Sequence, residues 1–130
     1  MRKYLVLFGI VLMGALLFSC NNAKTQAIDY NDEIVGLQSK ILRSMIDFSK
    51  TFSSNNTTLM EQKYTELLDS IDFALSGIET MPPFNGSSEF RDTAIRLFEF
   101  YDDVAKNEYG EIVEIFYQLF PHFLDVDSRR

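Results

Sequence analysis

The sequence predicts an all-α fold: an antiparallel three-helix bundle preceded by a signal peptide. Apolar residues recur at alternating three- and four-residue steps in three separate segments, which is the spacing of one face of a helix. No segment shows sustained alternation of apolar and polar residues, so strands are not expected. Polar stretches at 53–57 and 82–87 separate the three periodic segments and predict the two connections.

A cationic start and the apolar run behind it indicate a signal peptide over residues 1–19. Arg2 and Lys3 precede an apolar run over 4–18 that only two glycines interrupt. The run is shorter than the roughly 20 residues that span a bilayer, and no second apolar run follows it. We therefore expect this segment to be cleaved rather than retained as an anchor.

The single cysteine marks the expected processing site. Leu17-Phe18-Ser19-Cys20 resembles the lipobox of bacterial lipoproteins, in which the cysteine becomes the lipidated first residue of the mature protein. Phe18 departs from the small residue that is usual in the middle of the box. The resemblance implies attachment to a membrane through lipid on Cys20. The alternative is an ordinary secretory peptide cut nearby, which would leave Cys20 as a free thiol in an oxidising compartment.

Charge and cysteine content limit the partners and the source of stability. Loss of Arg2 and Lys3 with the signal would change the formal net charge from −7 to −9. Such an acidic surface disfavours nucleic acid and electrostatic adhesion to anionic lipid. One cysteine cannot form an intramolecular disulfide, so side-chain packing must stabilise the fold. The about 110 residues from Cys20 onwards are enough for one domain that folds alone.

The segment behind the cysteine differs from the helices that follow it. Residues 20–29 are polar and lack periodicity, which predicts a flexible tether leading to a helical bundle over 30–120. The first helix of the bundle is expected from about Asp32 to Phe52, with Asn31 as its N-cap. Its inward face should comprise Ile34, Leu37, Ile41, Met45, Phe48 and Phe52.

The second helix is expected to begin at a capping box. Thr58 would be its N-cap and Glu61 the reciprocal partner three residues on. The helix should end near Thr80, because Met81 precedes Pro82 and a residue before proline avoids the helical region. Its inward face should comprise Tyr64, Leu67, Leu68, Ile71, Leu75 and Ile78.

The third helix is expected to start after Ser87 or Ser88 and to continue up to a tail at 121–130, for which no structure is predicted. Its main apolar stripe keeps one phase through Asn107 and Gly110, which favours one long helix, kinked or straight. A break there would give four helices instead. The stripe comprises Ala94, Phe98, Tyr101, Ala105, Tyr109, Ile112, Phe116 and Leu119.

A second apolar strip lies beside this stripe and makes it wider than contact with two neighbouring helices requires. It comprises Leu97, Phe100, Val104, Val113, Tyr117 and Phe120. Two explanations stay open: the rings cover the flank of the bundle, or a helix from a second copy or a protein partner packs there. The candidate interface residues are Phe100, Val113 and Tyr117, and Tyr117→Asp is expected to dissociate an oligomer.

Short segments in the first and third helices point to a family. They are residues 30–35, Gln38 with Lys40-Ile41, Phe100-Tyr101 and residues 109–113. These segments resemble an uncharacterised family of helical surface-associated lipoproteins from Bacteroidota and Leptospira. The resemblance implies no activity and no catalytic residue. Members of that family continue into a further C-terminal helix, whereas this chain ends at Arg130, which leaves the completeness of the bundle open.

The residues that would carry catalysis or a cofactor are missing from the sequence, so we expect no enzyme, no metal and no cofactor. The only histidine, His122, lacks the glutamate one turn earlier that a di-iron bundle needs. Asp125-Val126-Asp127 lacks the remaining ligands of a calcium loop. A line of carboxylates on the third helix has no pocket to raise a pKa and is expected to be solvated. It comprises Glu99, Asp103, Glu111 and Glu114.

Two further patterns concern modification and location. Ser70 and Thr93 fit an Asp-Ser/Thr-apolar tripeptide that resembles the acceptor site of O-glycosylation in Bacteroidota. Asn21 behind the cysteine favours transfer to the outer membrane over inner-membrane retention. Lys24 lacks the adjacent acids of a surface-export signal, so we expect a periplasm-facing protein rather than a surface-exposed one. The expected role is a binding or structural module, and the alternative is an immunity-type inhibitor lipoprotein that captures a basic toxin or hydrolase.

Overall fold

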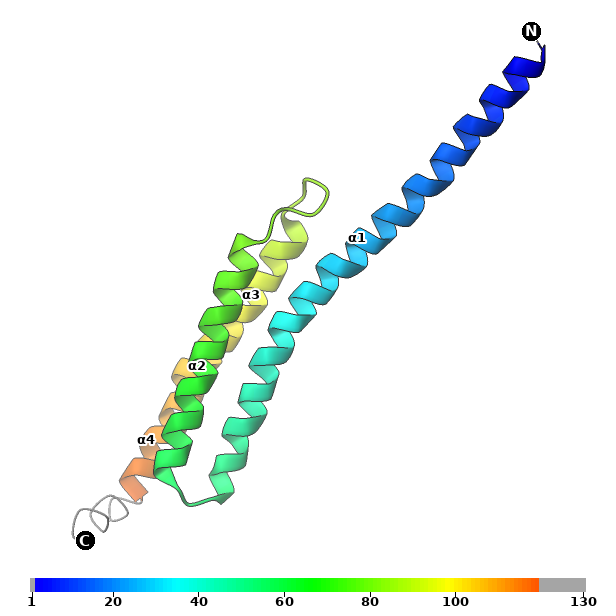
Figure 1. The fold of residues 1–130 in the computed structure, drawn as a ribbon. Coiled ribbons are helices and arrows are strands. Elements are labelled where there is room, and N and C mark those ends of the chain that lie inside the picture. The colour runs from blue at the N-terminus through cyan, green and yellow to red at the C-terminus, as the bar shows by residue number, and fades with distance from the viewer. Residues whose placement is uncertain (1, 120–130) are drawn as a thin grey trace. The chain divides into compact units, whose positions relative to one another are not determined.

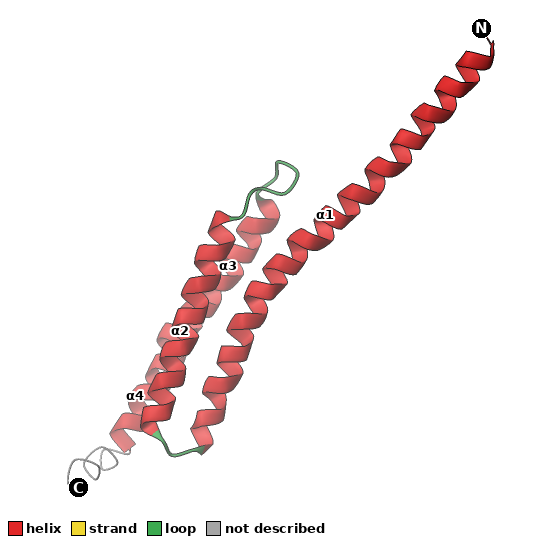
Figure 2. Ribbon diagram, viewed as in Figure 1, coloured by secondary structure: helices red, strands yellow, loops and turns green. Residues whose placement is uncertain are grey.

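A computed structural model describes the backbone of residues 2–119 and the side chains of residues 24–119. Its elements are α1 (Arg2–Lys50), a 3-10 turn η1 (Thr51–Ser53), α2 (Thr57–Thr80), α3 (Glu89–Val104), a π-helical segment η2 (Ala105–Tyr109) and α4 (Gly110–Leu119). Residues 2–119 contain helices and loops but no strand (Figure 2). The predicted all-α bundle is therefore confirmed, while the tail at 121–130, with His122, lies outside the described residues.

The chain divides into two compact units at Ile34. In the first, residues 2–33 are one stretch of helix, so 21–29 are helical where a flexible coil was expected. The reason is local composition, because neither glycine nor proline interrupts 15–35 and the alanine, lysine and glutamine residues there favour helix. Asn31 is consequently an internal residue of α1, and its prediction as an N-cap is wrong.

In the second unit, α2 runs antiparallel to the bundle part of α1 and to α3 (Figure 1). The buried side chains recur on one face of each helix, as the spacing predicted, with Met60, Ala74, Met81 and Val113 added to that set, whereas Leu119, which the spacing placed inward, is 66% exposed. The buried side chains are Ile34, Ile41, Phe48, Met60, Leu67, Ile71, Ala74, Ile78, Met81, Ala94, Phe98, Ala105 and Val113. Because they come from all three long helices, the core lies along the common axis of the bundle.

Contacts between α1 and α2 are close along their length. A Cβ added at Gly77 would come within 3.1 Å of Leu37, so this glycine lets the two helices approach. Two turns further along α1 from Leu37, Ser44 and Ser70 share a hydrogen bond of 2.7 Å between their hydroxyls. At the other end of the bundle, the ring of Phe48 lies 5.7 Å from that of Tyr64. The side of α1 that faces α2 is therefore well covered.

The start of α2 differs from the prediction, whereas its end agrees with it. Asn56, not Thr58, is the N-cap of α2: it is extended, and its side-chain oxygen accepts a hydrogen bond of 2.9 Å from the Leu59 N–H. Thr57 is 5% exposed and is the first residue of the helix, which therefore begins two residues earlier than a cap at Thr58 would place it. The end at Thr80 is confirmed, because Met81 before Pro82 has the extended ψ of 135° that proline favours.

The connection from α2 to α3 is a tight turn. Asn85 and Gly86 have φ values of 51° and 80°, the left-handed region that asparagine and glycine tolerate best. The Ser87 N–H closes the turn by donating to the Phe84 carbonyl at 2.9 Å. Arg91 donates to the Met81 carbonyl at 3.0 Å and so joins the start of α3 to the end of α2. α3 then begins after Ser88, as predicted.

The third helix is continuous through Asn107 and Gly110, as favoured, but only by way of the π-helical segment η2. A π-helical turn accommodates one extra residue within an α-helix. The buried positions accordingly step from Phe98 to Ala105 by two regular turns, and from Ala105 to Val113 by two turns and one residue more. Val113 is therefore buried in place of Ile112, which the unbroken phase had placed inward.

Candidate functional site

The largest group of exposed apolar side chains on the bundle follows the line where α1 and α3 meet. The line is marked by a hydrogen bond of 3.0 Å in which the Gln38 amide donates to the Tyr101 hydroxyl. Apolar residues lie within about two turns of Gln38 on α1 and within about one turn of Tyr101 on α3. We call this surface the seam; it comprises Val35, Leu42 and Ile46 on α1 and Leu97, Phe100 and Val104 on α3.

All seam residues except the half-buried Val104 are exposed. Phe100 is 59% exposed, Ile46 55%, Val35 45% and Leu42 40%. Helix geometry places the seam residues on the sides of α1 and α3 that face away from α2. On α1, the opposite side of the helix carries Lys40 and Ser44, which contact α2. There the Lys40 ammonium lies 3.6 Å from the centre of the Phe73 ring, and Ser44 bonds Ser70. The seam thus has no covering helix within the described residues.

The three predicted interface residues do not form one surface. Phe100 belongs to the seam, with its ring centre 6.3 Å from that of Tyr101. Val113 is only 8% exposed and belongs to the core, so its prediction as an interface residue is wrong. The extra residue in η2 turns it inward. Tyr117 lies on the side of α4 that faces α2, where its hydroxyl donates to the Glu61 carboxylate at 2.6 Å.

The Tyr117–Glu61 pair is an ordered polar contact between α4 and α2. Its hydrogen bond to the Glu61 carboxylate, followed by partial burial, raises the pKa of the Tyr117 phenol to about 12. Tyr117→Asp would place a second carboxylate against Glu61. That substitution therefore perturbs the fold of one chain and is a poor probe of an oligomer.

The α1 half of the seam was missed by the sequence analysis. The signal was present, because Val35, Leu42 and Ile46 are spaced by seven and four residues and so share one face beside the inward face of Ile34 and Ile41.

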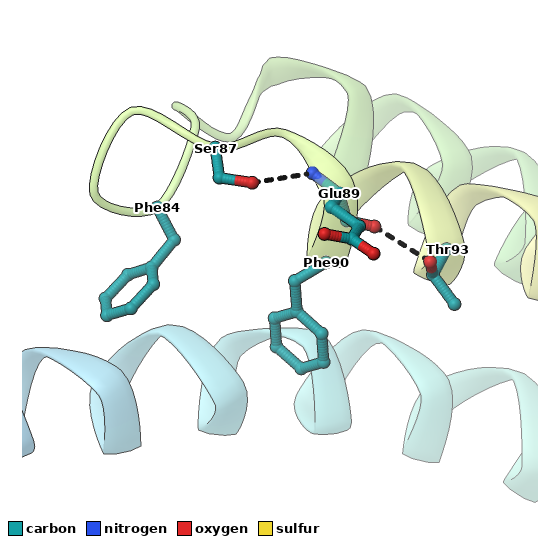
Figure 3. A pocket seen from close by; sticks show the side chains of 5 residues that line it. All are labelled: Phe84, Ser87, Glu89, Phe90 and Thr93. Atoms are coloured by element: carbon teal, nitrogen blue, oxygen red, sulfur yellow. Dashed lines mark hydrogen bonds between the residues drawn. The ribbon is translucent and has the colours of Figure 1, made fainter.

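An open hollow lies at the α2–α3 turn. It has a volume of about 300 Å³ and is lined by Phe84, Ser87, Glu89, Phe90 and Thr93. The Phe84 and Phe90 rings point to the same side of the turn (Figure 3). The two hydroxyls are used by the backbone: Ser87 accepts from the Glu89 N–H at 3.4 Å, and Thr93 donates to the Glu89 carbonyl at 2.8 Å. The hollow therefore offers apolar contact rather than an activated nucleophile.

The remaining candidate residues are separate from the seam. Ser70 donates to the Glu66 carbonyl at 2.7 Å in the middle of α2 and contacts Ser44, whereas Thr93 is exposed on α3. Glu99, Asp103, Glu111 and Glu114 are all exposed. Across the described residues, no three histidine, cysteine or acidic side chains converge as a metal site would require. Cys20 lies in the backbone of α1, and its side chain is outside the described part of the chain.

Comparison with known proteins identifies no relative: no protein-family model, no curated protein and no solved structure matches this chain. Among the described residues, no helix combines the length and the apolar character that crossing a membrane requires. The lipobox and the family resemblance stay predictions, and a function has to be argued from the residues of this chain alone.

Proposed function

We propose that the protein is a lipid-anchored protein of the bacterial cell envelope whose helical bundle serves as a binding or structural module. One observation carries the role of the bundle: the seam exposes apolar side chains along two neighbouring helices with no described helix over them. Monomeric soluble domains rarely expose contiguous apolar surface of this kind, and such surfaces mark interaction sites.

The anchor is supported by the order of the N-terminal features. A cationic start, an apolar run too short to span a bilayer and Leu17-Phe18-Ser19-Cys20 follow one another as in a lipoprotein precursor. Each buried methylene of an attached chain contributes about 0.8 kcal/mol, so two or three acyl chains hold a protein lastingly. The acidic mature chain needs such an anchor, because its charge does not attract it to anionic lipid.

Lipidation is tested by metabolic labelling with a fatty-acid probe. Cys20→Ser should abolish the label, because the thioether that carries the diacylglyceryl group requires the sulfur. Ser19→Ala is the matched control: it keeps the cysteine and a small residue before it, and should keep the label. Equal labelling of the wild type and Cys20→Ser would disprove the anchor.

Protease treatment of intact cells then tests orientation, and a periplasm-facing bundle should survive it until the cells are lysed.

A second candidate is an immunity-type inhibitor lipoprotein that captures a basic toxin or hydrolase. The observation that favours it is the exposed acidic line of Glu99, Asp103, Glu111 and Glu114 along α3 and α4. A cationic enzyme that binds the wild type, dissociates at moderate salt and fails to bind Asp103→Asn with Glu111→Gln would support this candidate. Binding that persists in this double variant and is lost with Phe100→Ser would favour the apolar module instead.

A further inference from the structure

We infer that the seam binds a second copy of this chain in a parallel two-fold dimer, with α1 of each copy packed on α3 of the other. This goes beyond the proposed function and does not depend on the lipid anchor. The groove between α1 and α3 carries the exposed apolar side chains of the seam, and the same helix pair of a second copy can cover it.

The charges along the two edges of the seam favour a second copy of this chain as the molecule that binds there. The bundle part of α1, 34–50, has three basic residues and one acidic residue, whereas 89–119 has eight acidic and three basic residues. Beside the seam, Arg43 follows Leu42 on the outer edge of α1, and Asp103 precedes Val104 on the outer edge of α3. Both are exposed, and neither forms an ion pair within the described part of the chain. The seam therefore has one basic edge and one acidic edge.

Two symmetric arrangements can bring two seams together. A two-fold axis across the helices would place α1 on α1 and α3 on α3, so that edges of like charge would meet. A two-fold axis along the helices places α1 of one copy on α3 of the other, so that Arg43 of each copy approaches Asp103 of its partner. Like charges facing each other are unfavourable and opposite charges favourable, which selects the second arrangement.

The arrangement also fixes which residues face each other along the helices. Rotation about a two-fold axis permits no shift along that axis, so residues at equal height in the bundle meet. The hydrogen bond between Gln38 and Tyr101 shows that these two residues lie at the same height. Leu42 and Val104 each lie about one turn beyond this level, so Leu42 of one copy is expected to pack near Val104 of the other, with Phe100 about one turn away.

Cysteine crosslinking of the full-length chain in total extracts of the cells that express it, with membranes included, tests the pairing. Arg43→Cys and Asp103→Cys would be made in two chains with different tags, expressed together and treated with an oxidant. We expect a disulfide between the two different chains and none between identical chains. Arg43→Cys paired with Asp72→Cys, an exposed position on α2, is the matched control and should give none. A parent without either cysteine reports any bridge through Cys20.

Three results would overturn the inference. Crosslinking of Arg43→Cys to itself would show the antiparallel arrangement. Equal crosslinking at Asp72→Cys would show random collision. No crosslink at any position would mean that the seam is covered by something other than a second copy, such as a helical partner or another segment of the same chain. Adding Phe100→Ser to both chains should abolish the expected disulfide, and persistence of the disulfide would show that the seam is not the contact.

Discussion

Phe98 and Phe100 lie two positions apart in α3 but in opposite environments. Phe98 is 0% exposed and faces the core, whereas Phe100 is 59% exposed and lies on the seam. The residue type and the helix are the same, so the difference in exposure depends on whether another helix packs against the side of α3 on which each residue lies. α2 and the core cover one side of α3, and no described element covers the other. The comparison shows that an apolar residue in a periodic pattern need not belong to the core.

The largest expected effect is on the buried side. Phe98→Ala should lower the free energy of unfolding by about 3–5 kcal/mol, because it removes a fully buried ring and leaves a cavity. Urea denaturation followed by circular dichroism measures this change. A loss below about 1 kcal/mol would mean that the region around Phe98 can collapse or is not part of a packed core.

A smaller effect is expected where α4 meets α2. Tyr117→Phe should lower the free energy of unfolding by about 1 kcal/mol or less, because the lost hydrogen bond to Glu61 is partly exposed to water. The pKa of Tyr117 is raised in the folded chain, to about 12, so the contact stabilises the fold fully below the ordinary tyrosine pKa of about 10. That contribution is lost as pH rises through about 12.

Titration of the Tyr117 phenol tests the contact with Glu61 more directly than the stability measurement does. Absorbance of tyrosinate during alkaline titration should show one tyrosine of the wild type ionising later than the same residue does in Glu61→Gln. The same late component should disappear in Tyr117→Phe. A wild-type curve identical to that of Glu61→Gln would show that the contact between α4 and α2 does not form in solution.

The smallest effect on one chain is expected at the seam. Phe100→Ser should change the stability of the isolated chain by at most about 0.5 kcal/mol, as surface substitutions usually do. The measurement is chemical denaturation at protein concentrations low enough to separate copies. If Phe100→Ser proved as destabilising as Phe98→Ala under these conditions, an element of the same chain would have to cover the seam.

The inward faces of the helices could be predicted because burial follows helical spacing directly. Ile41, Leu67 and Phe98 are buried where the spacing placed them. The N-cap of α2 could not be predicted from the sequence, because several side chains at 53–58 can accept a backbone hydrogen bond. The burial of Thr57, a tertiary effect, decides among them. Val113 was misplaced because a change of helix type within α3 and α4 leaves no mark in an apolar pattern that is already wide.

The seam was only half predictable for a similar reason. A wide apolar stripe indicates extra surface, but it does not say how many neighbours cover that surface. The sequence predicted the Phe100 side of the seam on the third helix. It did not predict the matching side of α1, because only the hydrogen bond between Gln38 and Tyr101 shows that these two helices are neighbours. The partner of the seam depends on charge at its edges, which spacing alone does not reveal.

The π-helical segment makes this part of the chain tolerant of a change in length. An added residue would normally turn everything behind it by about 100° around the helix axis. Here Ala105–Tyr109 hold the additional residue, and Val113 still points inward. A chain shorter by one residue in this segment is expected to keep the same core, with regular α-helix in place of η2. The segment ends at Gly110, where a Cβ would lie 3.0 Å from the Tyr64 hydroxyl, so a larger residue there would require the Tyr64 side chain to shift.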